Sequence, residues 1–321
     1  MAQKEAYERG AEAHDQGDFA QAIAYFTQSI EIDPNCADAY NIRGNAYAVL
    51  GDTDKAINAY NQAIKIDLNF AMAYYNRGNT YKDLRDDEKA IADYTEEIKI
   101  DPNYAAAYNN CGYIYYHLGE YEKAIKDCDK AIEIDPNLAS AYINRGLAYH
   151  ELGEYKKTIG DCDRAIKIDP NDAISYYNRG NAYDKIGDYS KAIADFTQTI
   201  KINPKLAYAY NNRGYVCNKL GEYEKAIKNC DKAIEIDPNY AEAYYNRANA
   251  HSYLGEYKKA IASYDLAIKI NPNYAEAYHN RSLSFYHLKD YARATKDAKK
   301  ACELGLCGMF EFITQNEYLR D

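Results

Sequence analysis

The chain has 321 residues, a formal net charge of −10 at pH 7, and 37 Tyr with no Trp. A chain this acidic repels phosphate backbones and anionic lipid, so nucleic acid and membrane surfaces are excluded as expected partners. An aromatic content of 14% also excludes intrinsic disorder, which requires low hydrophobicity.

Residues 1–7 contain no apolar core of the kind that secretory signals carry. The eight Cys form no Cys-x-x-Cys pair and show no zinc-type spacing. We therefore expect reduced thiols, packed as small apolar side chains, and a cytoplasmic location. The cysteines are Cys36, Cys111, Cys128, Cys162, Cys217, Cys230, Cys302 and Cys307.

A glycine recurs every 34 residues, at Gly44, Gly78, Gly112, Gly146, Gly180 and Gly214. Repetition at this period indicates one supersecondary unit stacked many times along the chain. Extending the period divides residues 3–308 into nine repeats: 3–36, 37–70, 71–104, 105–138, 139–172, 173–206, 207–240, 241–274 and 275–308.

Each repeat is expected to form two helices, as 105–138 illustrates. Apolar residues recur at a spacing of three to four at Tyr108, Cys111 and Tyr115, which is typical of a helix. Gly119 then breaks the helix, and the same spacing resumes in residues 121–134. The Asp-Pro-Asn sequence that follows ends the second helix, because Pro136 cannot donate a backbone hydrogen bond.

Departures from this pattern are local and still allow a helical hairpin. Leu68 replaces the closing Pro, and Arg85 and Lys289 replace the Gly between the two helices. After the last repeat, residues 309–321 contain an amphipathic pattern. We expect a C-terminal capping helix there, because an open stack of repeats leaves an apolar end.

These residues at fixed offsets (aromatic, Gly, Tyr, Gly, Ala and Pro) resemble the tetratricopeptide repeat family over residues 3–308. The resemblance implies an all-α fold: a right-handed α-solenoid (superhelix) of nine two-helix repeats, plus the capping helix. It also implies a protein–protein interaction scaffold in which the first helix of each repeat lines a concave groove.

The sixth position of seven consecutive repeats is Asn, a residue that can pair with both groups of a peptide unit. A column of these residues is suited to hold an extended peptide backbone. The alternative interpretation is that Asn has no binding role and is only a polar residue that a regular repeat tolerates. The candidates are Asn76, Asn110, Asn144, Asn178, Asn212, Asn246 and Asn280.

Other positions expected in the groove are largely uncharged and rich in Tyr, which is favoured at binding hot spots. We expect these tyrosines to bind an extended partner segment that is neutral to apolar or rich in Ser and Thr. The candidates are Tyr113, Tyr116, Tyr177, Tyr208 and Tyr245.

Arg recurs at the seventh position and Asp at the twenty-third, for example Arg179 and Asp195, so we expect the two helices of a repeat to be paired by these residues.

No catalytic motif, phosphate loop or metal-ligand pattern is present, although His279 and His287 are two helical turns apart. We therefore expect no enzyme activity, cofactor or metal. The main alternative function is self-assembly into a homo-oligomer through the ends or the convex face. A further alternative is an enzyme accessory or a hydrolase whose catalytic residues form no recognisable motif.

Overall fold

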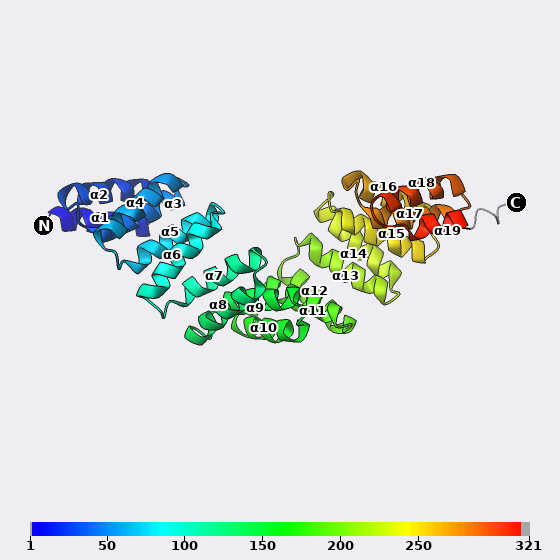
Figure 1. Ribbon diagram of the computed structural model, residues 1–321, viewed down its shortest axis with the longest axis horizontal. Coiled ribbons are helices and arrows are strands. Elements are labelled where there is room, and N and C mark those ends of the chain that lie inside the picture. Colours follow the sequence, from blue (N-terminus) through cyan, green and yellow to red (C-terminus); the bar gives the residue numbers. More distant parts are fainter. Residues whose placement is uncertain (1, 316–321) are drawn as a thin grey trace. The chain divides into compact units, whose positions relative to one another are not determined.

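A computed structural model describes residues 2–315, and within this range it contains 19 α-helices and no strand (Figure 1). The helices are α1 (Ala2–Asp15), α2 (Phe19–Ile32), α3 (Ala37–Val49), α4 (Thr53–Ile66), α5 (Ala71–Asp83), α6 (Asp87–Ile100), α7 (Ala105–His117), α8 (Tyr121–Ile134), α9 (Ala139–Glu151), α10 (Tyr155–Ile168), α11 (Ala173–Lys185), α12 (Tyr189–Ile202), α13 (Ala207–Lys219), α14 (Tyr223–Ile236), α15 (Ala241–Tyr253), α16 (Tyr257–Ile270), α17 (Ala275–His287), α18 (Tyr291–Glu303) and α19 (Gly308–Gln315). The predicted all-α fold of regular helix pairs is confirmed.

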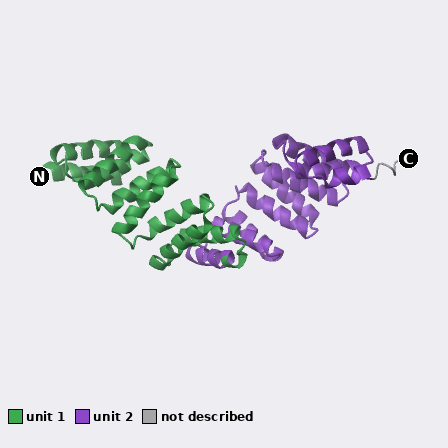
Figure 2. Ribbon diagram, in the orientation of Figure 1, with its two compact units in different colours: residues 1–157 green, residues 158–321 purple. Residues whose placement is uncertain are grey.

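The chain divides into two compact units, residues 1–157 and 158–321, shown in different colours in Figure 2. From α1 to α18, odd-numbered helices are the first helices of the repeats and even-numbered helices are the second. Small side chains allow these helices to approach one another. A Cβ atom placed on Gly44, for example, would lie 2.6 Å from the Cε1 atom of Tyr60 in α4.

The turn between the two helices of a repeat requires a left-handed backbone conformation. Gly51 has a φ of 80° and Gly119 a φ of 75°, which glycine adopts without steric cost. Arg85 and Lys289 occupy the same place with a φ of 62° each, so the turn is kept at the cost of strain.

The turn that closes a repeat depends on its Asp more than on its Pro. The backbone N–H of Asn35 donates to Oδ1 of Asp33, and the N–H of Asn69 donates likewise to Asp67. The second of these turns lacks the Pro, because Leu68 replaces it. The carboxylate that binds the backbone two residues onward is therefore sufficient to end the helix.

The expectation that all eight cysteines are reduced was wrong for one pair, because Cys302 and Cys307 form a disulfide. The chain reverses after α18 at Gly305, whose φ is 98°, and this turn brings the two Cα atoms to 3.9 Å. The other six cysteines form no disulfide, and all of them except Cys36 are buried.

α19 packs on the last helix pair. Met309 and Ile313 are buried against Phe285, Ala294 and Ala298. The rest of the expected C-terminal helix, residues 316–321, lies outside the described residues.

Candidate functional site

The sixth-position asparagines lie on the first helices of their repeats, and six of the seven donate a hydrogen bond to the preceding repeat. In one arrangement the Nδ2 atom donates to an Asn at the fifth position of that repeat. The pairs are Asn76 to Asn41 at 3.1 Å, Asn144 to Asn109 at 3.0 Å and Asn246 to Asn211 at 2.9 Å.

In the second arrangement the Nδ2 atom donates to an Asn at the ninth position and to a Tyr hydroxyl at the fifth. Asn212 contacts Asn181 at 2.9 Å and the hydroxyl of Tyr177 at 3.0 Å. Asn280 contacts Asn249 and the hydroxyl of Tyr245, both at 3.0 Å.

Asn110 follows this second arrangement in the N-terminal compact unit. Its Nδ2 atom lies 3.0 Å from Oδ1 of Asn79 and 3.4 Å from the hydroxyl of Tyr75. The asparagines therefore link neighbouring repeats, which the sequence interpretation did not include. The sequence contains the information needed to predict these hydrogen bonds, because an Asn stands at the fifth or the ninth position of each acceptor repeat.

The candidate asparagines differ in how far their side chains are exposed and in which polar atoms remain available to a binding partner. Asn144 and Asn246 are only 8% and 6% exposed, so they serve mainly the packing between repeats. Asn76, Asn110, Asn178, Asn212 and Asn280 are half-buried. The side chain of Asn178 forms no hydrogen bond with another described residue, and the side-chain Oδ1 atoms of Asn76, Asn110 and Asn280 accept none within the described chain.

The candidate tyrosines are half-buried and form ring contacts along the same helices. Tyr177 and Tyr208 pack edge to face, with ring centroids 4.5 Å apart. Tyr113 and Tyr116 both pack against the ring of His117. Burial raises the pKa values of Tyr116, Tyr177, Tyr208 and Tyr245, so these phenols remain protonated and able to donate.

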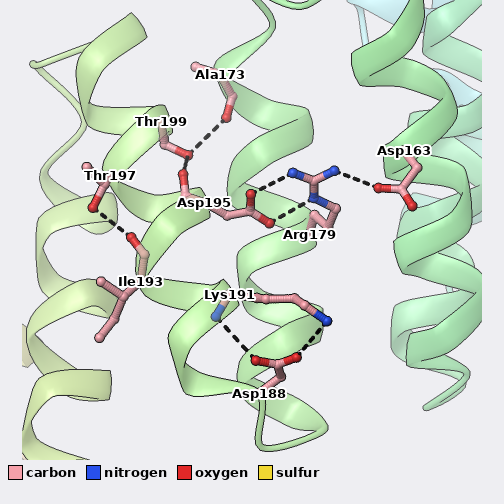
Figure 3. Close-up of polar contacts among 9 residues, drawn as sticks. All are labelled: Asp163, Ala173, Arg179, Asp188, Lys191, Ile193, Asp195, Thr197 and Thr199. Atoms are coloured by element: carbon pink, nitrogen blue, oxygen red, sulfur yellow. Dashed lines mark hydrogen bonds and ion pairs between the residues drawn. The ribbon is translucent and has the colours of Figure 1, made fainter.

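A separate polar network involves the seventh-position arginines and confirms the expected pairing with Asp. Arg179 donates from Nε and Nη2 to the carboxylate of Asp195 at 2.8 and 2.7 Å (Figure 3). Its Nη1 atom also donates to Asp163 in the preceding repeat, at 2.6 Å. This bidentate arrangement, which recurs between Arg77 and Asp93, joins the helices both within and between repeats.

Repeat 105–138 lacks the arginine, because its seventh position is Cys111. Asp127 at the twenty-third position consequently loses its expected partner, and burial raises its pKa to about 6.

Glu97 is a second unusual carboxyl, and the repeat pattern gave no reason to select it as a functional residue. It is 2% exposed, and its Oε2 atom has no hydrogen-bond partner in the described chain. Burial, with a contribution from the nearby Asp101, raises its pKa to about 8. The corresponding position in most other repeats is Ala, for example Ala131 and Ala165.

No group of three or more His, Cys, Asp or Glu in residues 2–315 is arranged to hold a metal ion. None of the helices in the same range is both long enough and apolar enough to cross a membrane.

Family models match nearly the whole chain. A model described as TPR repeat matches residues 10–51, 44–84, 78–119 and 112–153. Models described as tetratricopeptide repeat match 139–172, 173–206, 207–240, 241–274 and 275–304. The chain therefore belongs to the tetratricopeptide repeat family, whose members are generally protein–protein interaction scaffolds.

No curated protein matches the chain. Among solved structures, a tetratricopeptide repeat protein from Parabacteroides merdae ATCC 43184 is 22% identical, with a TM-score of 0.57 over 78% of this chain and 98% of its own. YrrB, described as a TPR protein with an unusual peptide-binding site, is 25% identical, with a TM-score of 0.50 over 59% of this chain and 97% of its own. Both comparisons agree with the tetratricopeptide repeat fold.

Proposed function

We propose that this protein binds extended segments of a partner protein along the first helices of its repeats. The proposal depends mainly on Asn76, Asn110 and Asn280, whose Nδ2 atoms are held by hydrogen bonds to the preceding repeat while their Oδ1 atoms accept no hydrogen bond from the described chain. A binding group that is already ordered loses little conformational entropy when the partner arrives.

The hydrogen bonds divide these asparagines into two kinds. Some can only accept a hydrogen bond from a peptide, and others can both accept one and donate one. Asn110 and Asn280 use Nδ2 toward two or more acceptors, so their oxygens are left to accept from a peptide N–H. Asn76 uses its Nδ2 once, and Asn178 not at all, so each could pair with both groups of a peptide unit.

The tyrosines would supply most of the contact area. Tyr113 and Tyr116 would do so in the N-terminal unit, and Tyr177, Tyr208 and Tyr245 in the C-terminal unit. Tyrosine combines an apolar ring with a hydroxyl that can donate, so a neutral, apolar or Ser/Thr-rich segment fits these surfaces best. The likeness to YrrB, a protein described as having a peptide-binding site, supports the proposal.

The test is a selection of random 12-residue peptides against the full chain, followed by calorimetry with the selected peptides. Asn178→Ala is the cleanest variant, because the Asn178 side chain forms no hydrogen bond with another described residue and its loss removes no bond between repeats. We expect Asn178→Ala or Asn110→Ala to weaken binding roughly tenfold. The control is Asn171→Ala, which changes an exposed residue in a turn. Equal affinities for all these proteins would exclude the asparagines as the binding groups.

The same experiment separates this function from self-assembly. If no peptide is selected and the mass measured by light scattering rises with protein concentration, homo-oligomerisation becomes the better explanation.

The division into nine repeats and a C-terminal cap is part of the same proposal. We place the cap at 309–321, since Met309 and Ile313 of α19 cover apolar residues of the last helix pair. Truncation after residue 307 should then expose apolar surface and promote aggregation, measured by light scattering.

A further inference from the structure

Two of the four seventh-position arginines of the C-terminal unit lie between two carboxylates, and a third, Arg247, contacts one carboxylate, that of Asp231. Arg179 lies between Asp195 and Asp163 (Figure 3), and Arg281 lies between Asp297 and Asp265. In both cases the carboxylates raise the pKa of the guanidinium, so its charge is neutralised within the protein.

Repeat 207–240 keeps the arginine and replaces both carboxylates. Nε of Arg213 donates to Oδ1 of Asn229 at 2.8 Å, and Nη1 donates to Oγ1 of Thr197 at 3.0 Å. Thr197 and Asn229 thus occupy the two places that Asp163 and Asp195 hold around Arg179. In the sister repeats 173–206 and 275–308, the Nη2 atoms of Arg179 and Arg281 each donate to a carboxylate. Nη2 of Arg213 contacts no acceptor among residues 2–315.

Arg213 is therefore a half-buried cation without a counterion in the described chain. Burial lowers its pKa, in contrast to the raised values of Arg179 and Arg281. The amide of Asn229 cannot supply the missing charge, and its Nδ2 atom donates to the carbonyl of Lys225.

The unpaired guanidinium lines a pocket of about 370 Å³ between α12, α13 and α14. Lys225, Lys228 and Lys232 lie around the same pocket, and its only acidic lining residue is Glu222, which is 3.0 Å from Lys225. Ile193 and Tyr210 provide apolar walls. The pocket is basic although the chain as a whole has a net charge of −10.

Two comparisons within the chain single out this pocket. A pocket of about 640 Å³ has the corresponding place beside Arg281, but there Asp265 and Asp297 already neutralise the guanidinium. Arg43 also lacks a carboxylate, but the positions of the three lysines are occupied there by Lys55, Asn58 and Gln62.

We propose that the pocket at Arg213 is a second binding site, which takes the carboxylate of an acidic side chain, Asp or Glu, from a partner peptide. A carboxylate is the group that fills the equivalent places in the sister repeats, and its two oxygens match the planar guanidinium. The lysines attract the acidic segment and contact neighbouring carboxylates.

This site is independent of the asparagine surface. On α13, Tyr210, Arg213 and Cys217 are three to four residues apart and share one side of the helix, whereas Asn211, Asn212 and Tyr215 face away from it. An experiment that contradicts one of the two proposals therefore does not contradict the other.

The experiment is calorimetry of the full chain with two capped peptides, triglutamate and triglutamine, at low ionic strength. Wild type is expected to bind triglutamate saturably and triglutamine not at all. Asn229→Asp restores the carboxylate of the sister repeats, so it should keep the fold and weaken triglutamate binding at least tenfold. Asn137→Asp, at an exposed turn, adds the same charge elsewhere and should leave binding unchanged.

A second measurement locates the ligand. The Nε–Hε signal of Arg213 in a ¹⁵N-labelled sample should shift on titration, while that of Arg281 should not. The proposal is overturned if wild type fails to bind triglutamate, or if Asn229→Asp binds it as wild type does. Tighter binding of inorganic phosphate than of triglutamate would overturn the choice of a carboxylate. Asn178→Ala should bind triglutamate normally, which separates this site from the asparagine surface.

Discussion

The side chain of Asn246 donates from Nδ2 to Oδ1 of Asn211, across 2.9 Å and between two neighbouring repeats. Both residues are buried, so neither amide can exchange this partner for water. The Nδ2 atom of Asn211 in turn donates to Asn212 and to the hydroxyl of Tyr240, at 3.2 Å each. The packing of α13 on α15 therefore includes a nearly saturated polar network.

Asn246→Ala should destabilise this junction by about 1–3 kcal/mol, because it leaves the buried oxygen of Asn211 without a donor. Global unfolding of a repeat array need not be two-state, so the local measurement is amide hydrogen exchange. Exchange should accelerate in α13 and α15 and remain unchanged in α5. Asn178→Ala, at the same position of another repeat, is the control and should have a much smaller effect. Equal effects of the two variants would show that the Asn211 bond adds no stability.

Glu97 should make stability depend on pH in an unusual direction. Its pKa is about 8 in the folded protein and 4.5 in the unfolded chain. Between these values the folded protein holds a proton that the unfolded chain has lost, so the free energy of unfolding falls as pH rises. The slope should approach 1.4 kcal/mol per pH unit, which is about the maximum for one group.

Glu97→Gln keeps the size of the side chain and removes the titration, so its thermal stability should exceed that of wild type at pH 8 and approach it at pH 5. The comparison is a series of melting curves from pH 5 to pH 8. Glu88→Gln, an exposed change on the same helix, should preserve the wild-type slope. A wild-type slope retained in Glu97→Gln would assign the dependence to another group.

Arg85→Gly should stabilise the protein by about 0.5–1 kcal/mol. The left-handed conformation of Arg85 costs about 1–2 kcal/mol, and part of the gain is offset by the greater freedom of glycine in the unfolded chain. Urea denaturation of Arg85→Gly, Arg85→Ala and wild type measures the difference. Arg85→Ala retains Cβ and should behave as wild type, so a gain in that variant would point to the side chain and not to the backbone.

The six thiols outside the disulfide should react at very different rates with a disulfide reagent. Cys36 is half-buried, whereas the remaining five are buried, and burial raises the pKa values of Cys162 and Cys230 to about 12. At pH 8 we expect one fast thiol in the folded protein, because the thiolate is the reactive species. Cys36→Ser should abolish the fast phase, and unfolding should release the rest. Several fast thiols in the native protein would contradict the buried positions.

The repeat period made the helix pairs predictable, because a 34-residue recurrence of Gly, Ala and Tyr admits one stacked arrangement. The pairing of Arg179 with Asp195 was predictable for the same reason, since both residues recur at fixed positions.

The contacts of the candidate asparagines were not predictable from the period alone. Asn110 and Asn144 occupy the same position, but one donates to Asn79 and the other to Asn109, because the choice depends on the preceding repeat. The disulfide was missed because Cys302 and Cys307 lie where the repeat pattern stops, and the turn at Gly305 follows no repeat.

The two hydrogen-bond arrangements of the sixth-position Asn have a consequence for how such a chain can change in length. Asn212 reaches an acceptor at the ninth position and Asn246 one at the fifth, so the same residue fits either kind of preceding repeat. Loss or duplication of repeat 207–240 or 241–274 would bring a sixth-position Asn against a new neighbour that still offers an Asn acceptor at its fifth or ninth position. The gene could therefore gain or lose either of these repeats, in 34-residue steps, without a compensating substitution at the new junction.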